Sequence, residues 1–164
     1  MSKTSYHALH LHFVFSTNRR KRCIKGNVQI YLYEALRALI SDSGGQVLSV
    51  GGTTDHVHIL ASMPPTVDLS KIIQKVKSTS TRWLNERYFT DDKFRWAKGY
   101  AVFSVSQSMI GKTIRYIDEQ WDIHKSSSFK EELIRMLRAH NMELDTWDGP
   151  VRRKKRGVGV SSEI

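Results

Sequence analysis

His56 and His58 are the pair of residues in this sequence that most directly suggests chemistry. They stand one residue apart in a run of strand formers, 55–60, and successive side chains of a strand point to opposite faces. Both imidazoles should therefore share one face and form half of a metal site that another segment completes. Two ordinary strand histidines explain the pattern equally well, and His10 and His12 repeat the same spacing.

Tyr116 and Gln120 form a second candidate pair. Apolar residues recur at helical spacing from about 109 to 124, and a step of about 100° per residue gathers an expected buried stripe of Ile110, Ile114, Ile117 and Trp121. Tyr116 and Gln120 lie one turn apart on the edge of that stripe, so both can point into a groove between helix and sheet. A tyrosine phenol is a poor nucleophile near neutrality unless it loses its proton during attack or lies near a cation.

The elements that position these residues follow from the hydrophobic pattern. Alternation and helical periodicity predict strands, helices and their order along the chain. The expected elements are strand 6–16, helix 28–40, strand 46–50, strand 55–63, helix 69–87 capped by Asp68, strand 101–106 and helices 109–124 and 129–140. This order predicts an α+β fold, a ferredoxin-like antiparallel sheet (βαββαβ) with additional C-terminal helices. We expect one domain over 1–148 and a basic, flexible tail over 149–164.

Composition points to a polyanionic partner. Lys and Arg total 26 against 16 Asp and Glu in 164 residues, which gives a formal charge of +10 and a pI near 9.9. Nucleic acid is the favoured partner, and a membrane surface is a weaker candidate. The simpler alternative is that this is a soluble basic protein with no polyanionic partner. Cys23 is the single cysteine, which excludes an internal disulfide and argues against a thiolate zinc site. With no apolar stretch of about 20 residues and no signal-peptide pattern, we expect a cytoplasmic protein.

Basic clusters are the expected DNA contacts, although a solvated surface is the simpler interpretation of any one of them. Four residues follow the first strand, two lie near the second helix and the last strand, and two lie in the tail. They are Asn18, Arg19, Arg20, Lys21, Arg82, Lys98, Arg152 and Arg153.

Three motifs together resemble one family. The strand Asp55-His56-Val57-His58-Ile59-Leu60, the segment 98–106 and the helix motif Tyr116-Ile117-Asp118-Glu119-Gln120 are similar to the single-tyrosine HUH transposases of the insertion sequence 200 and 605 type, which include the repeat-associated tyrosine transposases. The similarity runs from about residue 6 to about residue 147. The basic turn at 18–21 and the segment 129–133 match that family's pattern as well.

The resemblance implies a role for each matching residue. His56 and His58 would be metal ligands, Gln120 the third ligand and Tyr116 the nucleophile. The metal would be Mg²⁺ or Mn²⁺, and the protein a homodimer whose Tyr116 acts in its own subunit or in the partner's. Two positions depart from the family. Glu119 replaces a frequent Asn and would bind metal or face solvent, and His124 stands alone where a histidine pair is common, so a structural role is favoured for it.

The function implied by the resemblance is a metal-dependent endonuclease and strand transferase acting on single-stranded DNA. Such transposases recognise subterminal hairpin or palindromic repeat DNA and form a 5′-phosphotyrosine intermediate. Two alternatives remain open. One is a non-catalytic or domesticated protein that binds hairpin DNA, and the other is a nickase of the replication-initiation or relaxase type.

Overall fold

A four-stranded sheet with helices on both faces makes up the part of the chain that the computed structural model describes, residues 5–144. The elements appear in the predicted order, with two short 3₁₀ turns added. They are β1 His10–Ser16, η1 Asn18–Arg20, α1 Asn27–Asp42, β2 Gln46–Gly52, β3 His56–Ser62, α2 Leu69–Arg87, β4 Ala101–Val105, η2 Gln107–Met109, α3 Ile110–Asp118, α4 Gln120–Ile123 and α5 Phe129–Ala139.

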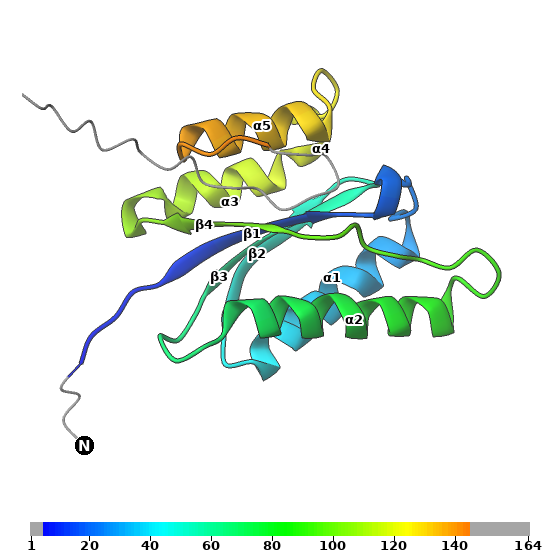
Figure 1. Ribbon diagram of the computed structural model, residues 1–164, viewed down its shortest axis with the longest axis horizontal. Coiled ribbons are helices and arrows are strands. Elements are labelled where there is room, and N and C mark those ends of the chain that lie inside the picture. The colour runs from blue at the N-terminus through cyan, green and yellow to red at the C-terminus, as the bar shows by residue number, and fades with distance from the viewer. Residues whose placement is uncertain (1–4, 145–164) are drawn as a thin grey trace, which may run out of the picture.

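The sheet has the order β2-β3-β1-β4, and each neighbouring pair is antiparallel. β3 is therefore an interior strand, joined to β2 by a tight turn. Figure 1 shows α1 and α2 on one face of the sheet and α3, α4 and α5 on the other. The predicted α+β, ferredoxin-like fold with additional C-terminal helices is confirmed.

Alternation along the two central strands separates the main core from the polar side chains. Phe13 and Phe15 of β1, with Val57 and Ile59 of β3, are at most 2% exposed and pack in the core beneath α1 and α2. The residues between them must point to the other face. That face carries His56 and His58, so these histidines lie under the C-terminal helices.

A smaller apolar core secures α5 to the sheet. It contains Val14 of β1, Phe103 of β4, and Phe129 and Leu137 of α5. The start of α5 is fixed by a capping box, in which Glu131 N–H donates to Ser128 Oγ and Ser128 N–H donates to Glu131 Oε2. Together these contacts set the position of every side chain on the first turn of α5.

α3 approaches β2 closely at Gly51. A Cβ on this glycine would lie 2.7 Å from the Ile117 carbonyl oxygen and 2.8 Å from Ile117 Cγ2, which is closer than real Cβ contacts come. The absent side chain therefore lets the middle of α3 rest against the sheet. Tyr116 and Gln120, beside and just after Ile117, are brought to the histidine face by this contact.

The predicted helix 109–124 is broken at Glu119, whose φ of −88° and ψ of 10° end α3 before α4 begins. The prediction that Trp121 belongs to the buried stripe is wrong, because the break turns its side chain outward and leaves it 51% exposed. Ile117, before the break, is buried as predicted.

Other predictions about the ends of elements and of the chain have mixed outcomes. Asp68 caps α2 by accepting from Lys71 N–H over 3.2 Å, as predicted. The predicted boundary between a domain over 1–148 and a tail over 149–164 lies outside the described residues, as do Arg152 and Arg153. Within residues 5–144, no helix combines the length and apolar character needed to cross a membrane.

Candidate active site

The two residue pairs proposed from the sequence, His56 with His58 and Tyr116 with Gln120, lie together on one face of the sheet. His56, His58 and Gln120 are at most 1% exposed, whereas Tyr116 is half-buried. His56 Nε2 lies 2.8 Å from Gln120 Oε1, and the rings of His58 and Tyr116 have centroids 5.8 Å apart. Interior β3 and the α3–α4 segment thus bring the two predicted pairs into one cluster.

Glu132 joins the cluster from α5. Its side chain is fully buried, and Oε1 accepts hydrogen bonds from the Tyr116 hydroxyl and from Gln120 Nε2, the latter over 2.8 Å. Oε2 lies 2.8 Å from His124 Nε2. A buried carboxylate is stable only with such partners. Glu132 therefore binds together α3, α4 and α5 at the site.

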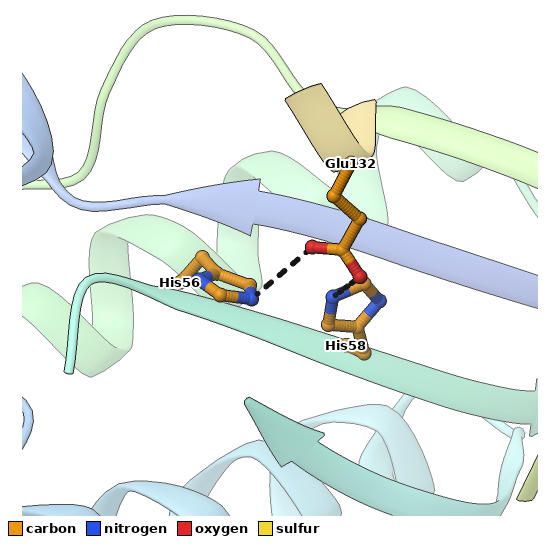
Figure 2. A group of neighbouring side chains, drawn as sticks. All are labelled: His56, His58 and Glu132. Carbon is orange, nitrogen blue, oxygen red and sulfur yellow. Dashed lines mark ion pairs between the residues drawn. The ribbon is translucent and has the colours of Figure 1, made fainter. Parts of the chain in front are cut away.

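The same carboxylate faces both strand histidines, as Figure 2 shows. Glu132 Oε2 is 3.5 Å from His56 Nε2, and Oε1 is 3.4 Å from His58 Nε2. One ligand atom from each of these residues lies within 4.8 Å of the others. Two imidazoles and a carboxylate are donors that divalent cations accept. This group can hold a divalent metal ion.

His58 Nε2 supports that assignment. The atom is buried, yet it makes no hydrogen bond to any residue of the described part of the chain. A buried polar nitrogen without a partner is costly. Its lone pair is directed toward the Glu132 carboxylate, so a shared cation would satisfy both groups.

His56 is oriented through its other nitrogen. Nδ1 lies 2.7 Å from Asp55 Oδ1, and since a carboxylate only accepts, Nδ1 carries the proton. Burial would raise the pKa of Asp55, but the His56 hydrogen bond outweighs it and lowers that pKa. Nε2 then presents a lone pair to Gln120 Oε1, unless the ring holds two protons. A cation coordinated by both atoms would remove the repulsion between these two acceptors.

His12 performs the corresponding role for His58. Its Nε2 lies 2.8 Å from His58 Nδ1, and both side chains are buried. Burial, together with the neighbouring His58, lowers the pKa of His12 to about 3, and burial also lowers the pKa of His58. Neutral His12 can therefore accept the Nδ1 proton of His58, which leaves His58 Nε2 unprotonated. Such contacts behind a ligand fix its tautomer and direction.

The electrostatics around Glu132 keep it ionised beside a neutral phenol. Burial would raise the pKa of Glu132, but the hydrogen bond from His124 and the proximity of the His58 ring outweigh it and hold that pKa far below its usual range. Burial and the Glu132 charge raise the pKa of Tyr116 well above its ordinary value. For His124, burial opposes the Glu132 hydrogen bond and charge, which nevertheless raise its pKa. Neutral Tyr116 thus donates a hydrogen bond to an ionised carboxylate.

The two residues that depart from the family pattern lie differently. Glu119 is exposed at the helix break and takes no part in the cluster. His124 is held between Ser127 O, 2.7 Å from Nδ1, and Glu132 Oε2, and its ring centroid lies 4.6 Å from that of His56. His124 therefore contacts the site through Glu132 and His56.

The predicted DNA-binding residues are spread over two regions. Asn18, Arg19, Arg20 and Lys21 form the exposed turn at η1, beside the start of β3, and Lys21 pairs with Asp92. Arg82 is on α2, which covers the opposite face of the sheet (Figure 1). Exposed Lys98 precedes β4, next to a groove that Gly99 lines against α2. A single track through all of them is not formed by the described residues.

Comparison with known proteins decides the family. A family model described as "Transposase IS200 like" matches residues 5–120. The chain belongs to the IS200-like transposase family. It is 25% identical over 121 residues to the ISDra2 transposase TnpA of Deinococcus radiodurans, a match that covers 70% of this chain and 85% of that protein. It is 28% identical over 120 residues to the transposase for insertion sequence element IS200 of Salmonella typhimurium, covering 70% and 78%.

Two solved structures share the fold of this IS200-like transposase. A Deinococcus radiodurans protein described as a transposase has a TM-score of 0.59 at 20% identity, covering 73% of this chain and 96% of that one. A REP-associated tyrosine transposase bound to a REP hairpin has a TM-score of 0.55 at 16% identity, covering 76% and 74%. The predicted family is confirmed, and transposition and DNA binding follow from it.

Sequence reasoning did not find Glu132 and set His12 aside. The signal for Glu132 was its place three residues after Phe129 and four before Met136, within the apolar stripe of an amphipathic helix. An acidic residue there must be buried with a partner. For His12, the signal was its place on the strand next to β3. That place follows from the strand register, in which His12 pairs with Leu60 and Val14 with His58, and the register cannot be seen in the sequence.

Proposed function

We propose that this IS200-like transposase cuts and rejoins single-stranded DNA through a covalent bond to Tyr116. One observation carries the proposal. The Tyr116 hydroxyl donates to the same carboxylate, Glu132, that faces His56 and His58 at 3.5 and 3.4 Å. A nucleophile beside a group that can hold a metal ion is suited to covalent phosphoryl transfer.

The proposed step balances with the groups at hand. Tyr116 Oη attacks a DNA phosphorus, a bond forms between them, and the bond from phosphorus to the 3′ oxygen breaks. The products are a 5′-phosphotyrosine and a free 3′ hydroxyl. The phenolic proton passes to Glu132 Oε1, and Glu132 then releases it, directly or through water, to the leaving 3′ oxygen. Reversal of the step with another 3′ hydroxyl rejoins strands.

Four side chains would hold the metal ion. The ligand atoms would be Nε2 of His56 and His58, Oε1 of Gln120 and a carboxylate oxygen of Glu132. When bound, Mg²⁺ or Mn²⁺ neutralises charge on the phosphoryl oxygens. Asp55 and His12 keep the two imidazoles in the ligating tautomer, and Gln120 couples them to the helix that carries the nucleophile. Nitrogen donors favour Mn²⁺ over Mg²⁺ in such a set.

We further propose hairpin or palindromic repeat DNA as the partner and a homodimer as the active form. The basic composition and the hairpin bound to the REP-associated relative support the first. Family resemblance supports the second. The DNA that flanks the gene for this chain is the natural source of substrates.

The test is trapping of a covalent adduct. Single-stranded oligonucleotides tiled from both flanks of the gene, labelled at the 3′ end, are incubated with protein and Mn²⁺ and resolved under denaturing conditions. The wild type should carry label on the protein. Tyr116→Phe should form no adduct while binding hairpin DNA nearly as before. Adduct formation by Tyr116→Phe would refute the role of Tyr116.

A DNA-binding protein without catalysis is the second candidate. The burial of His56, His58, Gln120 and Glu132, each at most 1% exposed, favours it, since no phosphate can touch them in this conformation. It predicts that EDTA changes no activity of the protein. Cleavage that EDTA abolishes and Mn²⁺ or Mg²⁺ restores would exclude this candidate.

A further inference from the structure

A groove of about 670 Å³ opens beside the candidate active site. It lies where η1, the β2–β3 turn, α4 and the start of α5 meet, at one end of the sheet (Figure 1). Asp55, His124 and Phe129 line its inner wall, and all three contact His56. The Phe129 ring stacks on His56 with centroids 4.4 Å apart. The groove is therefore separated from His56 by a single layer of side chains.

Trp121 forms part of the groove wall and is 51% exposed. The helix break at Glu119 turns it outward, whereas Trp83 and Trp96, the other tryptophans in the described part of the chain, are half-buried and buried. An exposed indole in a groove is unusual for a side chain of this size. Flat aromatic faces of this kind stack with unpaired nucleobases irrespective of their identity.

Basic residues also line the groove. Arg19, Arg20 and Arg22 come from η1 and the residues just after it, and Lys125, which pairs with Asp122, follows α4. Among the lining residues the single carboxylate is Asp55, and this group is already bonded to His56. Guanidinium groups bind phosphate oxygens through two parallel hydrogen bonds. Charge in the groove thus complements a phosphodiester backbone.

The arginine turn is held in a conformation that side chains rarely adopt. Arg19 and Arg20 have φ of 52° and 55°, in the left-handed region that favours glycine. The turn is fixed at its base by Thr17, whose Oγ1 donates to Lys21 O over 2.8 Å and to Asp55 O over 3.1 Å. Strained backbone supported by its surroundings is frequent at binding sites. Here it places Arg19 and Arg20 along the groove beside the candidate active site.

We propose that this groove binds single-stranded DNA next to the phosphate that Tyr116 attacks, with one base stacked on Trp121 and phosphates on Arg19, Arg20 and Arg22. The inference rests on the proposed function for its orientation toward the site. It names the residues that hold the single-stranded DNA outside any hairpin. Binding of this part of the DNA should depend little on its base sequence.

The experiment measures equilibrium binding of the full-length protein to a fluorescein-labelled, mixed-sequence oligonucleotide of twelve nucleotides without a hairpin. EDTA is present so that no strand is cut. Trp121→Ala should weaken binding about tenfold or more, and Trp121→Phe should restore most of the loss because a smaller ring still stacks. Tyr100→Ala, which removes an aromatic 39% exposed in a different groove, should bind as the wild type does.

Arg19→Gly separates DNA binding from folding. Glycine accepts the left-handed conformation, so the melting temperature should hardly change. Loss of one phosphate contact should weaken binding several-fold and reduce the slope of log K against log salt by about 0.7. Lys75→Ala, at an exposed cation on α2, should leave affinity and slope unchanged.

The results divide clearly. If Trp121→Ala and Arg19→Gly bind the probe as the wild type does, or if the wild type does not bind it, the groove proposal is overturned. That result would leave the adduct at Tyr116 unaffected. If both variants lose affinity while no adduct forms on any flanking DNA, the groove proposal stands and the proposed chemistry fails.

Discussion

The Tyr116 hydroxyl donates a hydrogen bond to the carboxylate of Glu132, a residue of α5 that is fully buried. The candidate nucleophile is therefore oriented by a helix other than its own. Because the same carboxylate faces His56 and His58, the position of the tyrosine is coupled to that of the two histidines proposed to bind metal.

Glu132→Gln keeps the shape of the side chain and removes its charge. We expect Mn²⁺ affinity to fall about 10- to 100-fold, as for other groups around metal sites, and adduct formation to fall at least as much. Isothermal titration with Mn²⁺ and the adduct assay measure the two effects. Glu131→Gln removes the same charge from exposed surface and retains a capping box, so it should behave as the wild type. Equal behaviour of the two variants would contradict the role of Glu132.

His12→Phe keeps a buried ring and removes the acceptor for His58 Nδ1. His58 would lose its fixed tautomer, so Mn²⁺ affinity should drop by about tenfold or more while the fold persists. Calorimetry and a melting curve check both statements. His10→Ala, at the other histidine of the same pattern, removes a bond to Gln107 outside the cluster and should leave Mn²⁺ affinity unchanged. A His12→Phe protein that binds Mn²⁺ normally would show that this contact is only structural.

Gly51→Ala should force α3 away from β2, since the new Cβ would meet the Ile117 carbonyl at 2.7 Å. We expect a loss of about 1–3 kcal/mol of unfolding free energy, typical of overpacking, and a larger loss of adduct formation because Tyr116 and Gln120 move with the helix. Gly111→Ala places its Cβ 3.9 Å from the nearest atom, Arg115 Nη1, and should be neutral or slightly stabilising. Denaturant titration of both variants gives the comparison.

Mn²⁺ should stabilise the folded protein even without DNA. A ligand that binds only the native state at 100 times its Kd adds about 2.7 kcal/mol, so the melting temperature should rise with Mn²⁺. His58→Ala should lose that rise, and His7→Ala, at an exposed histidine, should retain it. A melting temperature of the wild type that Mn²⁺ does not change would argue against the metal site.

Tyr116 lies beside His56 and His58 of its own chain, so we expect catalysis within one subunit. A mixture of Tyr116→Phe and His58→Ala should therefore form no adduct beyond the sum of the separate proteins. Each variant is first shown to fold by its melting curve. Recovery of activity in the mixture would instead mean that two subunits exchange these residues.

The sequence predicted the fold and part of the site, for identifiable reasons. Strand alternation at His56 and His58 and the one-turn spacing of Tyr116 and Gln120 are local patterns, and such patterns survive folding. Glu132 and His12 reach the cluster through α5 packing and strand pairing, which no local pattern encodes. Trp121 was placed wrongly because a constant angle per residue assumes an unbroken helix, and Glu119 interrupts it.

β3 carries the apolar core on one face and the imidazoles on the other, so the two depend on the same alignment with β1. A slip of one residue would exchange the faces, placing Val57 and Ile59 against Glu132 and both imidazoles in the core. A misaligned sheet would thus lose both its apolar core and the cluster of His56 and His58 with Glu132. If these histidines bind Mn²⁺ as proposed, binding of Mn²⁺ by a newly made chain would report that β1 and β3 have paired in this alignment.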